Sequence, residues 1–413
     1  MVRKMLLIRP KYLEMIRPYY DFDLIKVITG VRRSGKSRIL EMIIQELLNR
    51  GVSNDHIVFM NFENADYDVY RSLTALNDYI KSKIVDQQTH YLFFDEIQHV
   101  VEFERALASF KATLPCSIFV TGSTSDLLCG QLATLLTGRT IEFHVLPFSY
   151  AEARAYRLQS GKPIPENFLM EYIQWGGFPQ RFDIEDEQRR QVFLKQLYES
   201  ILERDIFRKN PRVDKDKFHA VARYSLATCG KDFAPTNVAH FFTTVNQTPK
   251  IEMSRTGVYN YVDLLQKAYL LQSIGRYEVR GKAMLDQTEK FYAVDNGLRT
   301  IQTDTFTFEK GFFLENILFN EFLLRGYSVY VGKTYKSEID FVVINQGKKC
   351  FVQVAYLLAS EDVIAREFGA FSSIKDEAPK FVLSLDRFDF SRNGIAHLNI
   401  EDYLLGKKDL FFT

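Results

Sequence analysis

The sequence predicts an α/β protein with a helical middle part, and three observations lead to this fold class. Strand-like apolar runs alternate with amphipathic helix-like runs from the N-terminus to about Pro147. Mostly helical patterns then follow to about Leu270. A second mixed segment of strands and helices runs from about Phe306 to the C-terminus. We therefore expect three domains, which comprise residues 1–180, 181–303 and 304–413.

Length and charge exclude several classes of protein. The chain has 413 residues, more than one ordinary hydrophobic core holds, and 46% of them are hydrophobic, as in folded globular proteins. The 53 Lys and Arg residues nearly balance the 52 Asp and Glu residues. This balance argues against nucleic-acid binding by the whole surface, although a local basic patch stays open.

Cysteine spacing and hydropathy indicate the environment of the protein. The 4 cysteines lie far apart and form no Cys-x-x-Cys pair, so we expect neither a disulfide framework nor a structural zinc site. No apolar run is long enough to cross a membrane. We therefore expect a cytoplasmic protein with no membrane partner.

A phosphate-binding loop is predicted between the apolar strand Leu24–Thr29 and an amphipathic helix that runs through Leu48. The intervening GVRRSGKS fits the pattern Gly-x-x-x-x-Gly-Lys-Ser/Thr. Its glycines let the backbone wrap closely around phosphates, its lysine neutralises their charge, and its final serine offers a hydroxyl to Mg²⁺. A chance glycine turn before a helix is disfavoured, because strand, loop and helix follow in order. The expected ATP and Mg²⁺ ligands are Gly30, Arg33, Ser34, Gly35, Lys36, Ser37 and Arg38.

Two neighbouring acids complete the predicted nucleotide site. The apolar strand Tyr91–Phe94 ends in Asp95 and Glu96. An acid at the carboxyl end of a strand beside a phosphate loop can hold the Mg²⁺ shell, and we assign Asp95 to this role. The next carboxylate can accept a proton from the attacking water, and we assign Glu96 as the general base. The alternative is an ordinary strand end capped by surface acids.

Two further polar positions are candidates for contact with the γ-phosphate. Ser123 follows the strand in SIFVTGSTSDLL and is our choice, with Thr124 in reserve; a helix N-cap is the competing reading of this position. Arg139 follows a glycine at the start of the next strand. It is assigned to the γ-phosphate of its own or a neighbouring subunit, while a solvated arginine is the alternative.

The middle part predicts a small module after a rigid turn. WGGFP contains the single tryptophan and a glycine pair ahead of a proline. Residues 253–282 outline a helix, a strand, a basic turn and a return strand, as in a winged helix that docks on DNA. The basic excess of this part is modest, so a packing spacer or protein-binding surface stays open.

A polar cluster is predicted in the C-terminal part. Asp340 lies on an apolar strand, a turn follows at Asn345–Lys348, and Gln353 lies on the return strand. A hairpin of this length brings Gln353 beside Asp340. Glu315 lies on the preceding helix, and strand alternation puts Ala355 on the same face as Gln353.

These pieces together resemble the prokaryotic AAA-superfamily ATPases that carry a C-terminal nuclease-like domain of unassigned function. The matching segments run in order over nearly the whole chain: GVRRSGKS, YLFFDEIQ, VTGSTSDLL, LLTGRTIEFHVLPFSYAEA, WGGFP, KFYAVDNGL, GFFLENILFNEFLLRGY, EIDFVV and FVQVAYLL. The resemblance implies a P-loop core, a winged-helix-like middle and a terminal domain similar to restriction-endonuclease folds.

The resemblance also implies a second metal site. In the metal nucleases of this fold, two acids and a Glu or Gln hold Mg²⁺, and a lysine two residues later assists the chemistry. Glu315, Asp340 and Gln353 match the ligands, but Ala355 stands where the lysine is expected. Substitutes for the lysine are Lys333, Lys336 and Lys349. We expect a relic that keeps the polar cluster without the activity.

The sequence thus predicts a Mg²⁺-dependent ATPase that switches the arrangement of a winged-helix-like module and an inactive nuclease-like domain. Its partner is a protein or a nucleic acid, with DNA docking through the middle module, and a homo-oligomer is compatible with the sequence. Two alternatives stay open: an ATP-regulated metal-dependent nuclease, and a scaffold that binds ATP without hydrolysing it.

Overall fold

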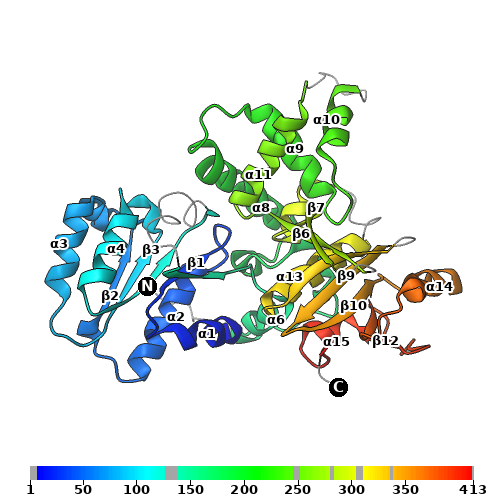
Figure 1. The fold of residues 1–413 in the computed structure, drawn as a ribbon, viewed down its shortest axis with the longest axis horizontal. Coiled ribbons are helices and arrows are strands. Elements are labelled where there is room, and N and C mark those ends of the chain that lie inside the picture. Colours follow the sequence, from blue (N-terminus) through cyan, green and yellow to red (C-terminus); the bar gives the residue numbers. More distant parts are fainter. Residues whose placement is uncertain are drawn as a thin grey trace. The chain divides into compact units, whose positions relative to one another are not determined.

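The computed structural model describes residues 7–125, 138–244, 252–279, 283–303, 310–334 and 338–411. The chain forms two compact units (Figure 1). The first comprises Met1–Pro147 with Lys267–Tyr269, and the second comprises Phe148–Gln266 with Leu270–Thr413. The predicted boundaries at residues 180 and 303 do not coincide with this division.

The first unit is built on a five-stranded parallel sheet with the strand order β2-β3-β4-β1-β5. Every residue of the central strands β1 and β3 is buried, as expected when helices cover both faces of a parallel sheet. The strands are β1 Ile25–Thr29, β2 Ile57–Asn61, β3 His90–Asp95, β4 Cys116–Thr121 and β5 Thr140–His144. The predicted parallel α/β fold of the N-terminal part is confirmed.

The helices of the first unit bury one apolar stripe each. In α2, Lys36–Asn49, the buried Ile39, Ile43 and Leu47 recur at intervals of four residues, which places them on one face of the helix. The other helices among the described residues of this unit are α1 Pro10–Ile16, α3 Leu73–Lys83 and α4 Phe103–Thr113. Buried residues of α3 and α4 join those of the sheet in one apolar core.

The second unit contains a seven-stranded sheet in the order β12-β11-β10-β9-β8-β6-β7. Its strands are β6 Leu271–Glu278, β7 Ala283–Ala293, β8 Ser328–Lys333, β9 Glu338–Asn345, β10 Lys348–Val354, β11 Lys380–Ser384 and β12 Ile395–Asn399. Its helices are α6 Tyr150–Gln159, α7 Phe168–Trp175, α8 Glu187–Ile201, α9 Lys215–Ala227, α10 Pro235–Thr244, α11 Arg255–Lys267, α12 Asn296–Thr300, α13 Lys310–Leu324, α14 Glu361–Gly369 and α15 Ile400–Leu404. A π-helical segment, Leu202–Phe207, continues α8.

The strands expected to form the wing of a winged helix belong to this large sheet. β6 and β7 pair antiparallel, as a hairpin would, but β6 also pairs in parallel with β8. An unpaired edge of β6 would leave its backbone N–H and C=O groups without partners, and β8 supplies them. The predicted separation of a winged-helix middle from the C-terminal domain is therefore not found at this sheet.

The hairpin of β9 and β10 has the turn that the sequence predicts. Asn345 pairs with Lys348, so the loop consists of Gln346 and Gly347. Both loop residues have positive φ, 48° and 79°, as a tight two-residue hairpin requires. The hairpin fixes the register of β9 against β10 and sets Asp340 near Gln353.

WGGFP and the later segment VDNGL interlock within the second unit. Gly177 donates its N–H to Asp295 Oδ2 over 2.5 Å, and Gly297 donates to Asp295 Oδ1 over 2.8 Å. Burial raises the pKa of Asp295 to about 6, although these two donors oppose the shift. A Cβ on Gly177 would lie 2.0 Å from the carbonyl oxygen of Phe148, so the backbones approach as closely as only glycine allows.

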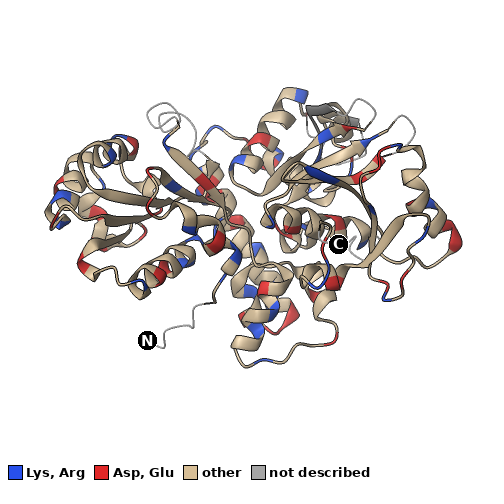
Figure 2. Cartoon of the chain, turned by 60° about the horizontal axis from the view of Figure 1, so that its bottom comes forward, with Lys and Arg blue, Asp and Glu red and all other residues tan. Residues whose placement is uncertain are grey.

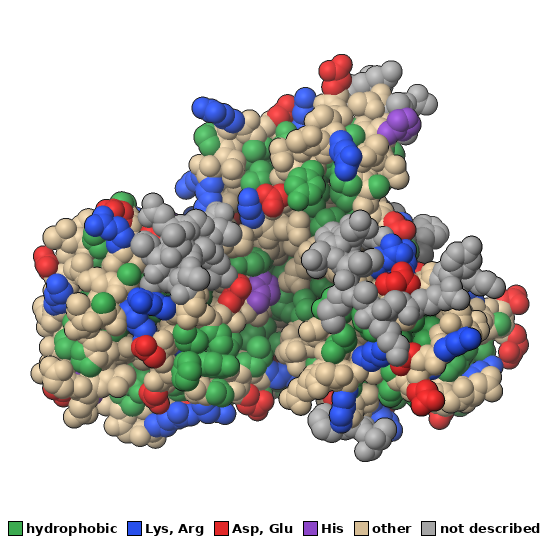
Figure 3. Space-filling view, viewed as in Figure 1, with side chains coloured by type: hydrophobic (Ala, Val, Ile, Leu, Met, Phe, Trp, Pro, Cys, Tyr) green, Lys and Arg blue, Asp and Glu red, His purple; other side chains and the backbone are tan. Residues whose placement is uncertain are grey.

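Charged side chains of both signs are interspersed along the elements of both units (Figure 2). The space-filling view shows the same mixture on its visible face (Figure 3). This distribution agrees with the nearly balanced composition. Among the described residues, no helix combines the length and apolar character that a membrane span requires.

We predict that Gly177→Ala lowers the stability of the second unit by about 1–3 kcal/mol or more, because the new methyl group overlaps the Phe148 carbonyl. Denaturant unfolding followed by tryptophan fluorescence measures the change. Gly369→Ala is the matched control, since no heavy atom lies within 4 Å of its added methyl group. Equal stability of both variants would contradict the close approach.

Candidate nucleotide site

The phosphate loop connects β1 to α2 at the carboxyl edge of the first sheet. Gly30 and Gly35 have φ angles of 138° and 104°, which side-chain-bearing residues rarely adopt. A Cβ on Gly30 would also lie 2.2 Å from the carbonyl oxygen of Val145. The two glycines therefore let the loop turn sharply and lie against the chain that follows β5. α2 begins at Lys36, so its N-terminal N–H groups face the loop.

Lys36 lies inside the loop with 4% of its surface exposed. Its Nζ donates to the carbonyl oxygens of Gly30 and Val31 over 3.0 and 3.3 Å. It also lies 3.8 Å from Glu96 Oε1. One ammonium group thus stands between the loop backbone and the proposed base, where it can meet the phosphates of a nucleotide.

Thr121 at the end of β4 holds the two acids in place. Its hydroxyl donates to Asp95 Oδ1 over 2.6 Å and accepts the N–H of Glu96 over 2.8 Å. Asp95 is 1% exposed, and burial raises its pKa, although hydrogen bonds from Thr121 and Ser37 oppose the shift. The hydrogen bond between Ser37 and Asp95 joins the hydroxyl and carboxylate that we predicted as Mg²⁺ ligands. This oxygen donor pair fits the ion.

Glu96 has an unusual backbone conformation. Its φ of 54° is left-handed, which turns the chain directly after β3 and directs the carboxylate toward Lys36. Gln98 donates its Nε2 to Glu96 Oε2. Strained backbone at this place is typical of functional sites.

Sequence reasoning missed Thr121 and Gln98. Thr121 is the last strand residue of VTGS, and the sequence pattern drew attention to the hydroxyls of Ser123 and Thr124 that follow it. Gln98 stands two residues after the base, and no local pattern marks it. Both act on the acids through hydrogen bonds that only the folded chain forms.

The structure buries Ser123 and Thr124 just past β4, with 1% and 3% of their surfaces exposed. The preceding Gly122 donates its N–H to Ile28 in β1 over 3.2 Å. This segment therefore lies beside the strand that leads into the phosphate loop. The contact of Ser123 with a γ-phosphate stays a prediction. The helix expected after Thr124 lies outside the described residues.

Arg139 lies just before β5, at the edge of the sheet opposite the phosphate loop. Its carbonyl oxygen accepts the N–H of Ile25 over 2.8 Å, at the amino end of β1. The phosphate loop follows Thr29 at the other end, roughly 13 Å along the strand. Parallel register thus separates the main chain of Arg139 from the phosphate loop, and contact of its side chain with the γ-phosphate of its own subunit stays a prediction. Action on a neighbouring subunit stays a prediction.

The arginine side chains of the loop point to other partners or to solvent. Arg32 pairs with Glu63 over 2.8 Å, and Arg38 pairs with Glu41 over 2.5 Å. Arg33 is exposed and has a φ of 65°. The N–H of Arg38 donates to the carbonyl oxygen of Gly35 over 3.0 Å, and contact of Arg33 and Arg38 with phosphates stays a prediction.

A second polar cluster lies in the second unit. Glu315, Asp340 and Gln353 line one pocket of about 690 Å³ together with Ala355 and Glu367. Gln353 Oε1 accepts the N–H of Asp340 over 3.4 Å. The structure thus brings the three predicted metal ligands to one pocket, and Gln353 lies beside Asp340 as the predicted hairpin requires.

Hydrogen bonds already engage these carboxylates. Asp340 Oδ2 accepts the N–H of Val354 over 2.8 Å, and Glu315 Oε2 accepts the hydroxyl of Tyr292 over 3.2 Å. Burial raises the pKa of Asp340 to about 7 and that of Glu315 well above its usual value. Both side chains therefore lie in surroundings that disfavour unbalanced negative charge.

The substitute lysines have partners of their own. Lys349 pairs with Asp376 over 2.6 Å, and Lys333 pairs with Glu338 over 2.5 Å. Lys336 lies outside the described residues. Sequence reasoning missed Lys290 on β7, which is 5% exposed and pairs with Glu338.

The charge of Lys290 is balanced by the acids around it. Burial alone would lower the pKa of Lys290, but the carboxylates of Glu315, Glu338 and Asp340 outweigh burial and raise it. The lysine therefore acts as a counter-ion within the polar cluster.

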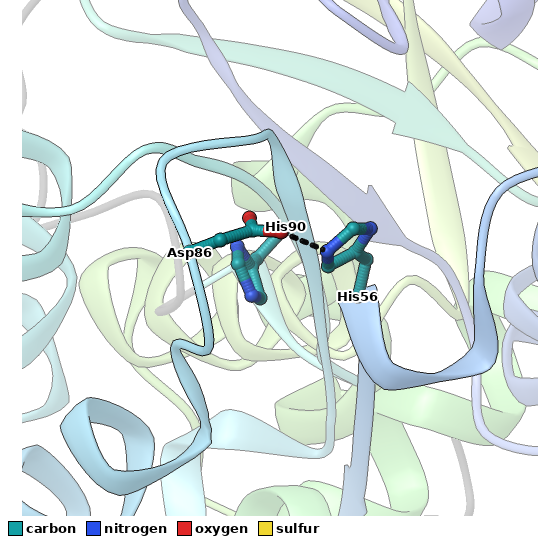
Figure 4. A group of neighbouring side chains, drawn as sticks. All are labelled: His56, Asp86 and His90. Atoms are coloured by element: carbon teal, nitrogen blue, oxygen red, sulfur yellow. Dashed lines mark hydrogen bonds and ion pairs between the residues drawn. The ribbon is translucent and has the colours of Figure 1, made fainter.

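A histidine pair with an acid lies at the amino edge of the first sheet (Figure 4). His56 Nε2 lies 3.1 Å from Asp86 Oδ2. Both ring nitrogens of His90 are engaged by the main chain: Nδ1 with the carbonyl of Gln88 over 2.9 Å, and Nε2 with the N–H of Val85 over 3.2 Å. Because main-chain groups occupy both ring nitrogens of His90, we assign this cluster a structural role, which is to hold the loop before β3 in its conformation.

Comparison with known proteins places the chain in a family. Residues 23–154 match the AAA domain, and residues 166–308 match a domain of unknown function (DUF8612). An uncharacterized protein of Haemophilus influenzae is 31% identical over 405 residues, which cover 97% of this chain and 99% of that protein. This chain belongs to the family of that protein. An uncharacterized protein of Methanocaldococcus jannaschii is 26% identical over 390 residues, which cover 92% of this chain and 85% of that protein.

The AAA match contains the phosphate loop, both acids and Thr121, so the first unit carries a P-loop ATPase domain of the AAA type. Two solved structures align over much of the chain. Orc1 of Aeropyrum pernix in complex with DNA has a TM-score of 0.33 and 11% identity, and covers 73% of this chain and 94% of that one. AMPPCP-bound DnaA of Aquifex aeolicus has a TM-score of 0.32 and 11% identity, and covers 61% and 86%. Likeness at this level carries no argument about function.

We predict that Lys36→Ala raises the Kd for ATP by about 10- to 100-fold, because a charge-assisted contact worth about 1.5–3 kcal/mol is lost. Isothermal titration calorimetry measures the affinity. Arg38→Ala is the control on the same helix turn; its side chain pairs with Glu41, so binding should hardly change. Unchanged affinity of the Lys36 variant for ATP would contradict the assignment of this loop as the nucleotide site.

Proposed function

We propose that this AAA-type protein is a Mg²⁺-dependent ATPase whose nucleotide state switches the second unit. The single observation that carries hydrolysis, as distinct from binding, is the Thr121 bridge, which fixes Asp95 and Glu96 beside Lys36. A scaffold that only binds ATP has no need of a base held at this place. The intact acid pair therefore favours an enzyme.

The proposed reaction is attack of water on the γ-phosphorus of ATP. Glu96 accepts the proton as the oxygen–phosphorus bond forms, and the bond to the bridging oxygen of ADP breaks. Lys36 stabilises the negative charge that develops on the phosphate oxygens. Gln98 and the left-handed backbone of Glu96 hold the carboxylate in one orientation.

Ser37 and Asp95 would hold the Mg²⁺ ion through a hydroxyl and a carboxylate oxygen. When bound, the ion neutralises phosphate charge. Thr121 keeps Asp95 in position, and Lys36 adds the second positive charge at the loop.

For the second unit we propose a nuclease-like fold without nuclease activity. Ala355 packs against Leu358, Ile364 and Phe368 and also lines the pocket of the acids, to which its methyl group brings no positive charge. Lys290 supplies positive charge to the acids from within the protein. The Lys290 ammonium group and the hydrogen bonds from Tyr292 and Val354 thus hold the acids in place, which supports a structural role.

The partner is proposed to be a protein or a nucleic acid that responds to this switch. The helices α9, α10 and α11 are the part that would contact DNA, and assembly of several copies would let Arg139 reach a neighbouring nucleotide. ATP turnover measured with duplex DNA, single strands, RNA or no addition identifies the class. Stimulation by one of these polymers assigns the partner, and uniform rates favour a protein.

We predict that Glu96→Gln binds Mg·ATP normally but hydrolyses it about 10²–10⁴-fold more slowly, because the proton acceptor is lost. Phosphate release under saturating ATP measures the rate. Asp95→Asn should differ by requiring more Mg²⁺ for half-maximal rate. Turnover of the Glu96 variant near the wild-type rate would assign the base elsewhere.

We further predict that plasmid, linear duplex, single-stranded DNA and RNA survive incubation with the protein and Mg²⁺ or Mn²⁺, with or without ATP. Asp340→Ala should leave ATP turnover unchanged, because Asp340 belongs to the other unit. The contrary result is cleavage that disappears in Asp340→Ala but persists in Lys36→Ala. That pairing would support the ATP-regulated nuclease.

A further inference from the structure

A buried arginine before α1 joins the phosphate loop to the end of the first unit. Arg9 is 2% exposed. Its Nη1 donates to the carbonyl oxygen of Ser34 in the loop over 3.2 Å. Its Nη2 donates to the carbonyl oxygens of Leu146 and Pro147 over 3.0 and 3.3 Å. One rigid guanidinium group therefore spans two segments that are far apart in the sequence.

Tyr12 and Gly30 add further contacts near the phosphate loop and the segment Val145–Pro147. The ring of Tyr12 lies 4.4 Å from the guanidinium carbon of Arg9, and its hydroxyl accepts the N–H of Leu146 over 2.9 Å. Gly30 lies so close to the carbonyl of Val145 that a Cβ would overlap it. The loop thus packs directly against Val145, and Arg9 and Tyr12 hold the residues that follow.

At position 9, arginine makes contacts that lysine could not make. Three carbonyl oxygens receive donors from one planar fork, which a single ammonium group on a flexible stem cannot reproduce. Arg9 Nη1 also lies 3.7 Å from the place of a Cβ on Gly35, so its charge lies next to the phosphate loop. Anything that shifts the Ser34 carbonyl therefore acts on the same guanidinium that holds Leu146 and Pro147.

Pro147 is the last residue of the first unit before Phe148 begins the second. We propose that Arg9 is a positioning residue that couples occupancy of the phosphate loop to the segment Val145–Pro147, and so to the entry into the second unit. The inference rests on the proposed switch. It assigns the route by which Mg·ATP acts on the rest of the chain.

The test is amide hydrogen exchange with and without saturating Mg·AMPPNP, a nucleotide that is not hydrolysed. The reporters are Leu146, whose N–H is held by Tyr12, and Phe148, whose N–H donates to Gly177 over 2.8 Å. We expect nucleotide to change their exchange in the wild-type protein. In Arg9→Lys that change should shrink on the order of 5-fold or more, with the nucleotide site still saturated.

Arg17→Ala is the matched control. This arginine belongs to the same N-terminal segment, but it pairs with Glu46 over 2.7 Å, away from the loop. Its variant should respond as the wild type does. If Arg9→Lys fails to fold by circular dichroism, Arg9→Gln is measured in the same way, with the same expectation.

The outcomes separate the two proposals. A full response in the folded Arg9 variant overturns the coupling role and leaves the switch intact. No response in the wild-type protein, with nucleotide bound by calorimetry, overturns both. A response in the wild type and in Arg17→Ala that is lost in the Arg9 variant supports the inference.

Discussion

Parallel pairing of β1 with β4, and of β4 with β3, is the constraint on which the nucleotide site depends. The carboxyl ends of parallel strands meet at one edge, so the phosphate loop after β1 and the acids after β3 lie near each other. β4 lies between them, and its last residue, Thr121, reaches both acids. A shift in this register would separate Lys36 from Glu96.

One buried charged side chain in each unit is held by main-chain groups. Arg9 donates to three carbonyl oxygens, and Asp295 accepts two glycine N–H groups. Such contacts require close approach of backbones, which explains why glycine stands at Gly30 and Gly177. They tie segments together at fixed distances.

The second unit holds a buried polar cluster beside its apolar core. The hairpin and α13 bring Glu315, Asp340 and Gln353 to one pocket. Ala355 also packs in the apolar core, and the buried Lys290 pairs with Glu338.

The sequence by itself determined the features that depend on neighbouring residues. The phosphate loop, the strand that ends in Asp95 and Glu96, and the turn at Gln346 and Gly347 follow from local patterns whose geometry is nearly fixed. Tertiary structure decided what depends on distant partners. The pairing of β6 with β8, the place of Arg139 at the far edge and the carbonyls that Arg9 binds arise from strand register and packing between remote segments. No local pattern encodes them, since one strand edge or one arginine can meet many partners and only the assembled core selects among them.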